Sequence, residues 1–507
     1  MSSRVKNTKR NIYSSYLLMV IQMIFQFLSK SIIVYTLGKE YLGLSSLFNS
    51  ILNVLNIAEL GLSSSVIYCM YKPLAEGDTD KVCALLAYLK TIYRVVGTVI
   101  IGVGVIVMPF IPKVISGNAP SDINIYILYL LYLVNTGISY FLYAYKTALL
   151  TAVQRLDLTK IASCIVTVIQ YVMQLVSLLY FHNYYFFVIS MILGTAFINI
   201  FTAYISQKKY PQYICKGKIN RNDKNTIASK VRGLMICNIS IVTYKSLDSI
   251  VISAFIGLTS VGIYNNYIVI FTAVTTLITT VRSAMQSSVG DSVVSESIEK
   301  NLDSVFLWQY LFSIITTICM VDLVCLYQPF MKIWMGKDML LPIKDVFLIG
   351  IWFLVDSVQQ AYYLYLTATG LWNEMKWSYV FNTCSNLIMN VLLGKFMGIT
   401  GIILASLLTC IVSGTFWQCI ILFREYFKKS ASKYIITQFK YFGKAGIITF
   451  VTYYMCHFIK YDGVLGLVCK GIYCTLLSGV LVYIFYCRND YYIKGKQLFY
   501  RIIQKNK

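Results

Sequence analysis

The sequence is poor in charged residues, in proline and in histidine. Charged residues make up 13% of the 507 positions, whereas a soluble domain has roughly a quarter. The chain contains 7 prolines and 2 histidines, and no hydrophilic stretch is long enough to form a soluble catalytic domain. These deficits argue against an ordinary soluble enzyme and predict that most of the chain lies in a membrane.

Motifs for nucleotide and metal chemistry are also missing. The sequence contains no Walker loop, no dinucleotide-binding glycine fingerprint and no His-Glu-x-x-His motif. None of its 14 cysteines is arranged as Cys-x-x-Cys, and most lie in apolar segments, where cysteine behaves as a small apolar residue. We therefore expect no cofactor, no metal site and no disulfide framework, and no ATP hydrolysis by this chain.

Long apolar segments fill the sequence instead. Hydrophobic residues make up 58% of the chain, and its mean hydropathy is +0.67. About fourteen apolar segments are each long enough to cross a hydrocarbon core of ~30 Å. The first of them, 12–37, is too long for the apolar part of a secretory signal, so we expect it to be the first span. The sequence predicts an all-α integral membrane protein with about 14 transmembrane helices.

The positive charge of the chain is unevenly placed. The formal net charge is +23, and lysine and arginine concentrate in every second loop, most of all in segment 207–233. The positive-inside rule then places both termini in the cytoplasm. Segment 207–233 either orients the protein and attracts anionic lipid headgroups or forms a specific binding patch. The concentration of lysine and arginine in the cytoplasmic loops accounts for the positive net charge, so we expect no nucleic acid as a partner.

Two parts of the sequence repeat each other at a distance of 219 or 220 residues. The recurring positions are Tyr143, Tyr145, Thr147 and Ala148 with Tyr363, Tyr365, Thr367 and Ala368, and Gly38 and Gly43 with Gly257 and Gly262. Two copies of one membrane-embedded unit are typical of carriers, because alternating access moves one half against the other. Each copy has an even number of spans, so the copies are expected to be parallel repeats.

The repeat predicts the domain organisation. Residues 1–206 form an N-lobe with spans one to six, and 207–233 form a basic cytoplasmic linker. Residues 234–423 form a C-lobe with spans seven to twelve. Residues 424–507 hold two extra helices and a basic cytoplasmic tail. The prediction is thus two parallel six-helix repeats plus two C-terminal helices.

Ionisable residues inside the predicted spans are candidates for function, because each costs about 2.5–3.5 kcal/mol at the membrane centre. Lys90 and Lys146 lie near a cytoplasmic end and are expected to reach water along their own side chains. The other candidates are the cations Lys30, Arg94, Lys245 and Arg282 and the acids Glu59, Asp248 and Asp356. The excess of cations predicts a cavity that binds an anion, of which phosphate or pyrophosphate is the natural membrane-associated example.

Several of these candidates have a second interpretation. Lys30 and Arg282 could also reach a membrane surface, and Lys245 could neutralise Asp248, three residues later on the same helical face. Glu59 and Asp356 are interpreted either as carriers of ion coupling or as partners in local salt bridges. Asn49, Asn53 and Asn56 share one helical face, which suits sugar hydroxyls or hydrogen bonds between helices.

Four stretches of sequence resemble a known family. They are 37–44 (LGKEYLGL), 59–62 (ELGL), 245–253 (KSLDSIVIS) and 261–267 (VGIYNNY). In these stretches, and over essentially its whole length, the chain resembles polysaccharide-export flippases for O-antigen, capsule or teichuronic acid. These flippases belong to the multidrug/oligosaccharidyl-lipid/polysaccharide (MOP) exporter superfamily.

The resemblance implies a flippase, not an enzyme, in the bacterial cytoplasmic membrane. Its substrate would be undecaprenyl-pyrophosphate-linked oligosaccharide, moved from the inner to the outer leaflet for surface polysaccharide biosynthesis. Membrane lipids, H+ or Na+ and the polysaccharide polymerase machinery are the other implied partners. Related lipid II flippases use arginines in spans one, two and eight. Here Lys30 and Arg282 lie in spans one and eight, but span two offers Glu59 and no cation.

Two alternatives remain open at this stage. A cation-coupled multidrug exporter of the same superfamily would share the architecture, although acids would be expected to dominate its cavity. A membrane polysaccharide polymerase or glycosyltransferase would need a sizeable outer loop or a cytoplasmic acidic pair, and the predicted loops are short.

Overall fold

The computed structural model describes residues 2–56, 62–116, 120–456, 458 and 463–497, and their regular structure is entirely helical. Nine helices within these ranges are long and apolar enough to cross a membrane, or ten if the bent pair α6 and α7 forms one span. The predicted all-α, multi-pass membrane fold is confirmed. By its internal contacts the chain divides into two compact units, Met1–Gly262 and Ile263–Lys507.

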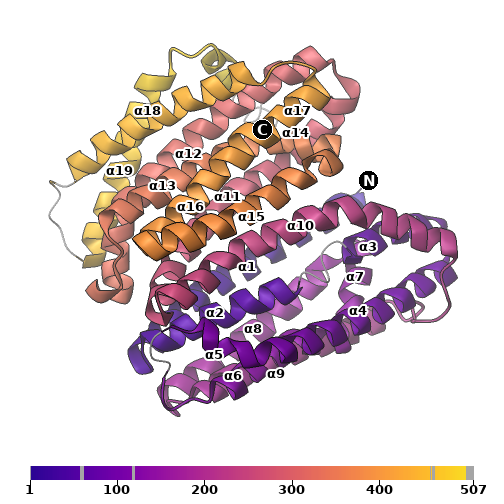
Figure 1. Cartoon of the computed structure of the whole chain (residues 1–507). Helices are drawn as coiled ribbons and strands as arrows, with labels where there is room; N and C mark the ends of the chain where they lie inside the picture. Colours follow the sequence, from indigo (N-terminus) through magenta and orange to yellow (C-terminus); the bar gives the residue numbers. More distant parts are fainter. Residues whose placement is uncertain (1, 57–61, 117–119, 457, 459–462, 498–507) are drawn as a thin grey trace. The chain divides into compact units, whose positions relative to one another are not determined.

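The first unit contains the helices up to α10 (Figure 1). Within it, α1 packs against α8, α8 against α9, and α6 against both α4 and α9. The helices are α1 (Ser2–Thr36), α2 (Lys39–Leu55), α3 (Leu62–Glu76), α4 (Thr79–Val107), the 3-10 turn η2 (Met108–Phe110), α5 (Ile111–Val114), α6 (Ile125–Phe141), α7 (Tyr145–Ala152), α8 (Leu156–Leu179), α9 (Tyr184–Lys209) and α10 (Arg221–Phe255).

The second unit is built around α12, which packs against α13, α18 and α19 (Figure 1). Helix α11 begins at the end of the first unit and runs mostly through the second. The elements are α11 (Leu258–Ser295), α12 (Ile298–Met335), η3 (Lys337–Met339), α13 (Ile343–Val358), α14 (Gln360–Thr369), α15 (Trp372–Met397), α16 (Ile399–Cys410), the π-helical η4 (Ile411–Gln418), α17 (Cys419–Leu422), the π-helical η5 (Phe423–Phe427), α18 (Ser432–Cys456) and α19 (Gly463–Tyr486).

The unit boundary lies beyond the predicted linker 207–233. Helix α10, which was expected to open the C-lobe, contacts α2, α3 and α5 and therefore clusters with the first unit. The lobe boundaries at 206, 233 and 423 were drawn from the sequence repeat, and they stay predictions.

Helix boundaries repeat along the chain as the sequence does. Helices α1 and α10 are both 35 residues long, and they begin 219 positions apart. Helices α4 and α12 also begin 219 positions apart. Their N-caps correspond, because Asp78 accepts a hydrogen bond from the Lys81 amide and Ser297 accepts one from the Lys300 amide. The two repeats therefore share helix start positions and N-cap residues.

The repeated glycines bring the starts of two equivalent helices together in the first unit. Gly38 precedes α2 with φ 116°, and Gly257 precedes α11 with φ 122°, a backbone conformation that favours glycine. A Cβ on Gly43 would collide with the Leu258 carbonyl, and a Cβ on Gly262 would lie 3.4 Å from the Lys39 carbonyl oxygen. Residues 39 and 258 are themselves equivalent, so each helix start faces the other copy.

The helix that carries the repeated tyrosines is interrupted in both copies. In the first copy, α6 and α7 meet at an angle of 51°, and Tyr143 lies in the break between them. In the second copy, Gln359 alone separates α13 from α14, and its backbone is helical, with φ −60° and ψ −21°. Tyr363 lies within α14, so the marked bend is found at the first tyrosine motif.

Candidate substrate-binding residues

Three of the four predicted phosphate-binding cations lie on three different helices of the first unit. Lys30 is half-buried on α1, whereas Arg94 on α4 and Lys245 on α10 are exposed. Arg94 is the sixteenth residue of α4, in the middle of a long apolar helix. Charged groups at such positions are found facing water or protein, since lipid solvates them poorly. Arg94 and Lys245 therefore have the exposure that a water-filled surface requires.

The predicted amide face on α2 is only partly free for a ligand. Asn49 and Asn53 are exposed, and Asn56 is half-buried. The Asn49 amide nitrogen donates to the Ser45 carbonyl at 2.8 Å, and the Tyr140 hydroxyl on α6 donates to the Asn56 side-chain oxygen at 3.4 Å. Asn56 thus makes the bond between helices that was one of its two interpretations, while Asn49 and Asn53 remain the better candidates for sugar contacts.

The acids fall into three different situations. Asp248 is buried on α10 at 4% exposure, and Asp356 is half-buried on α13. Both interact with neighbouring groups. Lys245, the suggested partner of Asp248, is exposed, so the two side chains have different surroundings. Glu59 lies outside the described residues.

A cluster of cations surrounds Tyr145 in the first copy of the tyrosine motif. The Lys90 ammonium lies 5.8 Å from the centre of the Tyr145 ring, and the Lys146 ammonium lies 6.0 Å from it. Cations at these distances are attracted by the negative face of the ring. Sequence reasoning did not single out this cluster, although the recurrence of Tyr145 as Tyr365 was visible.

The expectation that Lys146 reaches the membrane surface is wrong. Its side chain is 6% exposed, and its ammonium donates to the Gln207 side-chain oxygen at 3.1 Å and to the Tyr213 carbonyl at 3.4 Å. Gln207 lies in the last turn of α9, and Tyr213 lies in the segment that follows this helix. Lys146 therefore holds the start of the basic segment 207–233 against α7.

Arg282 lies on α11 of the second unit beside the second copy of the motif. Its guanidinium carbon is 6.0 Å from the centre of the Tyr363 ring. Its Nε is buried and has no hydrogen-bond partner among the described residues. A buried charged donor without an acceptor is unfavourable by about 1–3 kcal/mol or more. An anionic ligand would remove this deficit.

Hydrogen bonds hold the surroundings of Arg282 in place. One turn later on α11, the Gln286 side-chain oxygen accepts from the Thr367 hydroxyl at 2.6 Å, and its amide nitrogen donates to the Leu364 carbonyl at 3.3 Å. Thr367 belongs to the repeated motif. These two bonds fix α11 against α14, so the guanidinium is carried by a constrained helix.

The Tyr363 ring beneath Arg282 is also constrained. Its hydroxyl donates to the Gln418 side-chain oxygen at 2.8 Å, and its ring stacks on Tyr362 with 4.9 Å between ring centres. The Tyr379 hydroxyl lies 3.5 Å from the Tyr363 hydroxyl. Helices α14 and α15 and the π-helical η4 thus build a fixed aromatic platform next to the guanidinium.

Comparison with known proteins gives a fold. No family model matches the chain, and no curated protein matches it. Among solved structures, the lipid II flippase MurJ in an inward closed conformation is 16% identical, with a TM-score of 0.63 over 94% of this chain and 99% of that chain. An inward-facing multidrug resistance MATE family transporter of the MOP superfamily is 15% identical, with a TM-score of 0.63 over 81% of this chain and 98% of that one.

The chain shares the fold of these two proteins. An outward-facing MATE transporter of this superfamily is also similar, with 12% identity and a TM-score of 0.53 over 81% of this chain and 93% of that chain. The fold expected from the sequence resemblance is therefore confirmed, and the similar structures are transporters and flippases, not enzymes. The roles of Lys30, Arg94, Lys245, Arg282 and the other site residues stay predictions.

Proposed function

We propose that the protein flips undecaprenyl-pyrophosphate-linked oligosaccharide from the inner to the outer leaflet of the bacterial cytoplasmic membrane. The observation that carries this proposal is the buried Arg282 Nε, which has no acceptor among the residues that the structure describes and lies next to the fixed Tyr363 ring. A similar fold in a protein named as a lipid II flippase supports the same class of substrate.

The chemistry of the guanidinium favours a phosphate group. Arginine presents a planar fork of donors that matches phosphate oxygens, and it stays charged at every physiological pH. Each charge-assisted hydrogen bond contributes about 1.5–3 kcal/mol. Lys30, Arg94 and Lys245 of the first unit would add further positive potential that favours an anionic headgroup.

The remaining parts of the substrate need different surroundings. The exposed amides of Asn49 and Asn53 on α2 suit sugar hydroxyls, because an amide both donates and accepts. The polyprenyl chain is apolar and stays in the lipid. Ion coupling through H+ or Na+ is assigned to Asp356, Glu59 or Asp248, whose carboxylates can change protonation or bind a cation. Both termini would lie in the cytoplasm, near the polysaccharide polymerase machinery and its precursors.

The proposal is tested in cells whose surface polysaccharide depends on this protein. Arg282→Ala should abolish export and cause lipid-linked oligosaccharide to accumulate in the inner leaflet, at normal protein abundance. Arg282→Lys keeps the charge but loses the fork, so it should retain part of the export. Arg424→Ala is the matched control, because Arg424 forms an ion pair with Glu425 at the exposed surface. Normal export by Arg282→Ala would refute the site.

A second candidate is a cation-coupled multidrug exporter, favoured by the equal TM-score of 0.63 to an inward-facing MATE transporter. The substrates of such an exporter are expected to be positively charged, and the positive charge of Arg282 would repel them. Deletion of the gene should then raise drug sensitivity and leave surface polysaccharide unchanged. The opposite pattern is expected for the flippase.

A further inference from the structure

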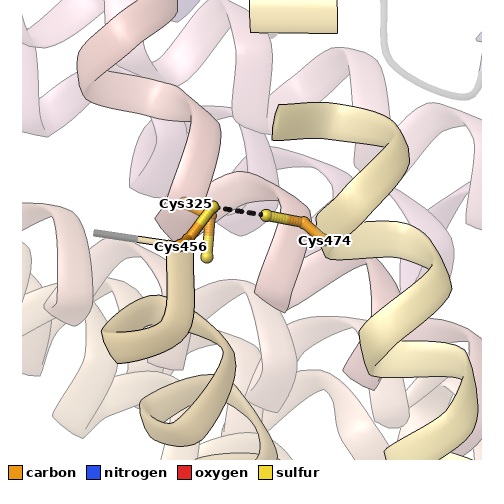
Figure 2. Close-up of side chains that lie close together, drawn as sticks. All are labelled: Cys325, Cys456 and Cys474. Atoms are coloured by element: carbon orange, nitrogen blue, oxygen red, sulfur yellow. Dashed lines mark hydrogen bonds between the residues drawn. The ribbon is translucent and has the colours of Figure 1, made fainter. Parts of the chain in front are cut away.

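Three cysteines meet in the core of the second unit. Helices α12, α18 and α19 pack against one another, and their shared apolar core contains Cys325, Cys456 and Cys474, one from each helix. Figure 2 shows the three side chains pointing toward one another. These residues are far apart in the sequence, and their spacing matches no metal-binding motif.

The geometry of this group differs from that of the other cysteines. The three sulfur atoms all lie within 4.8 Å of one another, and the Cys456 and Cys474 sulfurs are 3.1 Å apart. The exposed fractions are 6% for Cys325, 6% for Cys456 and 0% for Cys474. Across the part of the chain that the structure describes, no other set of three histidine, cysteine or acidic side chains approaches in this way.

We propose that Cys325, Cys456 and Cys474 form a binding site for one thiophilic d10 metal ion, Cu+ or Zn2+. Thiolates are soft ligands that select these ions over Mg2+ or Ca2+. A metal–sulfur bond is about 2.3 Å long, so sulfurs that share one ion lie about 3.8 Å apart. The observed separations bracket this value, and a small opening between Cys456 and Cys474 would admit the ion.

A disulfide accounts for less of this arrangement. A Cys456–Cys474 bond would use two sulfurs and leave Cys325 as a buried thiol without a role. A disulfide also requires an oxidant, whereas metal binding only requires each ligating thiol to release its proton. Simple packing of cysteine as a small apolar residue explains burial, but it does not require three thiols to converge on one point.

Nearby charges suit a bound thiolate complex. Lys470 precedes Cys474 by four residues on α19, so it lies on the same helical face, and it is half-buried. Its positive charge would offset part of the negative charge of the thiolates. Asp322 lies one turn before Cys325 on α12, but its carboxylate accepts from the Thr475 hydroxyl at 3.1 and 3.2 Å. It is therefore already engaged outside the sulfur group.

The site would fasten the two helices that lie beyond the repeats. Helices α18 and α19 follow the second copy in the sequence, whereas α12 belongs to it. An ion held by all three would tie these helices to the repeat core through short bonds. Binding to the folded state alone would raise the stability of this part of the protein.

The test measures metal in the full-length protein, purified from membranes with a tag that contains no histidine. After reduction, exposure to Cu+ or to Zn2+ in separate samples and removal of loosely bound metal, mass spectrometry should find about one ion per chain. Cys325→Ser, Cys456→Ser and Cys474→Ser should each lose it. Cys384→Ser and Cys469→Ser should keep it, because both of these cysteines are exposed.

The wild-type protein provides a second readout that does not depend on variant folding. The thermal unfolding midpoint of the wild-type protein should rise when the metal is bound and return to its starting value when a strong chelator removes the ion, because the ion binds the folded state alone. Less than about one tenth of an ion per chain after both exposures would overturn the proposal. So would a Cys456–Cys474 disulfide in the protein purified without reductant, or equal metal content in the cluster and control variants.

Discussion

The two copies of the tyrosine motif use nearby cations in opposite ways. In the first copy, Lys146 lies beside Tyr145 and its ammonium donates to two acceptors. In the second copy, Arg282 lies beside Tyr363 and its buried Nε has no partner among the described residues. A satisfied buried charge stabilises a fold, whereas an unsatisfied donor is available to a ligand. We therefore propose that the cation of the first copy stabilises the fold and that the cation of the second copy binds the ligand.

The copies also differ at the position that corresponds to Tyr145. In the second unit this residue is Tyr365, whose ring packs on Phe427 with 5.6 Å between ring centres. It is 0% exposed. The repeat thus keeps its tyrosines, while the charges around them have diverged. A parallel repeat provides two similar backbone arrangements, and the side chains of each copy decide its function.

The largest expected effect is a difference in ligand affinity between variants at the Tyr363 ring and variants at the Tyr145 ring. Arg282→Ala removes the fork that would hold a phosphate, so the Kd for a polyprenyl pyrophosphate should rise about 10- to 100-fold, as expected for a charge-assisted contact. Lys90→Ala, at the Tyr145 ring, should change this Kd less than about 3-fold. Binding to the purified protein in detergent measures both values. Equal weakening by the two changes would mean that both clusters contact the ligand.

The next effect concerns stability at the first cluster. Lys146→Met keeps the apolar stem but removes both donors to Gln207 and Tyr213, so it should destabilise the protein by about 3 kcal/mol. Thermal unfolding of the purified protein would show a lower midpoint. Lys209→Met is the control, because Lys209 is exposed at the end of α9. An unchanged midpoint for Lys146→Met would contradict the structural role of this cluster.

A smaller difference is expected between the two equivalent glycines. Gly43→Ala places a methyl group against the Leu258 carbonyl, and overpacking of this kind destabilises by about 1–3 kcal/mol. Gly262→Ala meets its neighbours at 3.4–3.5 Å, which is ordinary contact. It should be neutral or slightly stabilising, since alanine favours a helix over glycine by about 1 kcal/mol. Unfolding midpoints that fall equally for both variants would argue against the close approach at Gly43.

The smallest expected effect tests whether the two N-caps are equivalent. Asp78→Ala and Ser297→Ala each remove the side chain that accepts from the third residue of its helix. Each change should destabilise by about 1 kcal/mol. Hydrogen exchange of the first turns of α4 and α12 would report the loss locally. Faster exchange in only one of the two helices would show that the caps have diverged as the cations have.

Much of the architecture could be predicted because its causes are local. Apolar runs of about 20 residues specify membrane spans. The recurrence of Gly38 and Gly43 as Gly257 and Gly262 indicated two copies of one unit. The structure confirmed the helical repeat and explained Gly43 as a point of close approach, whereas Gly262 makes ordinary contacts.

The candidate site was predicted by residue type and depth alone. Arg282 was among the candidates because an embedded cation is costly, but nothing in the sequence showed that its Nε has no acceptor within the described part of the chain. Lys146 was misinterpreted, because its acceptors come from a segment more than sixty residues away. The exposure of Asn49 and Asn53 and the pairing of Asn56 with Tyr140 likewise depend on how α2 meets α6.

The sequence by itself determined that this protein is helical, embedded in a membrane and built from two similar halves, because apolar runs specify spans locally and the repeat is visible as recurring residues. Only the tertiary structure decided which charges are satisfied and which cysteines meet. Cys325, Cys456 and Cys474 lie on three helices, and no pattern along the chain records their approach. Contacts between side chains that are distant in the sequence depend on how the helices pack, and this packing depends on all the helices of the unit.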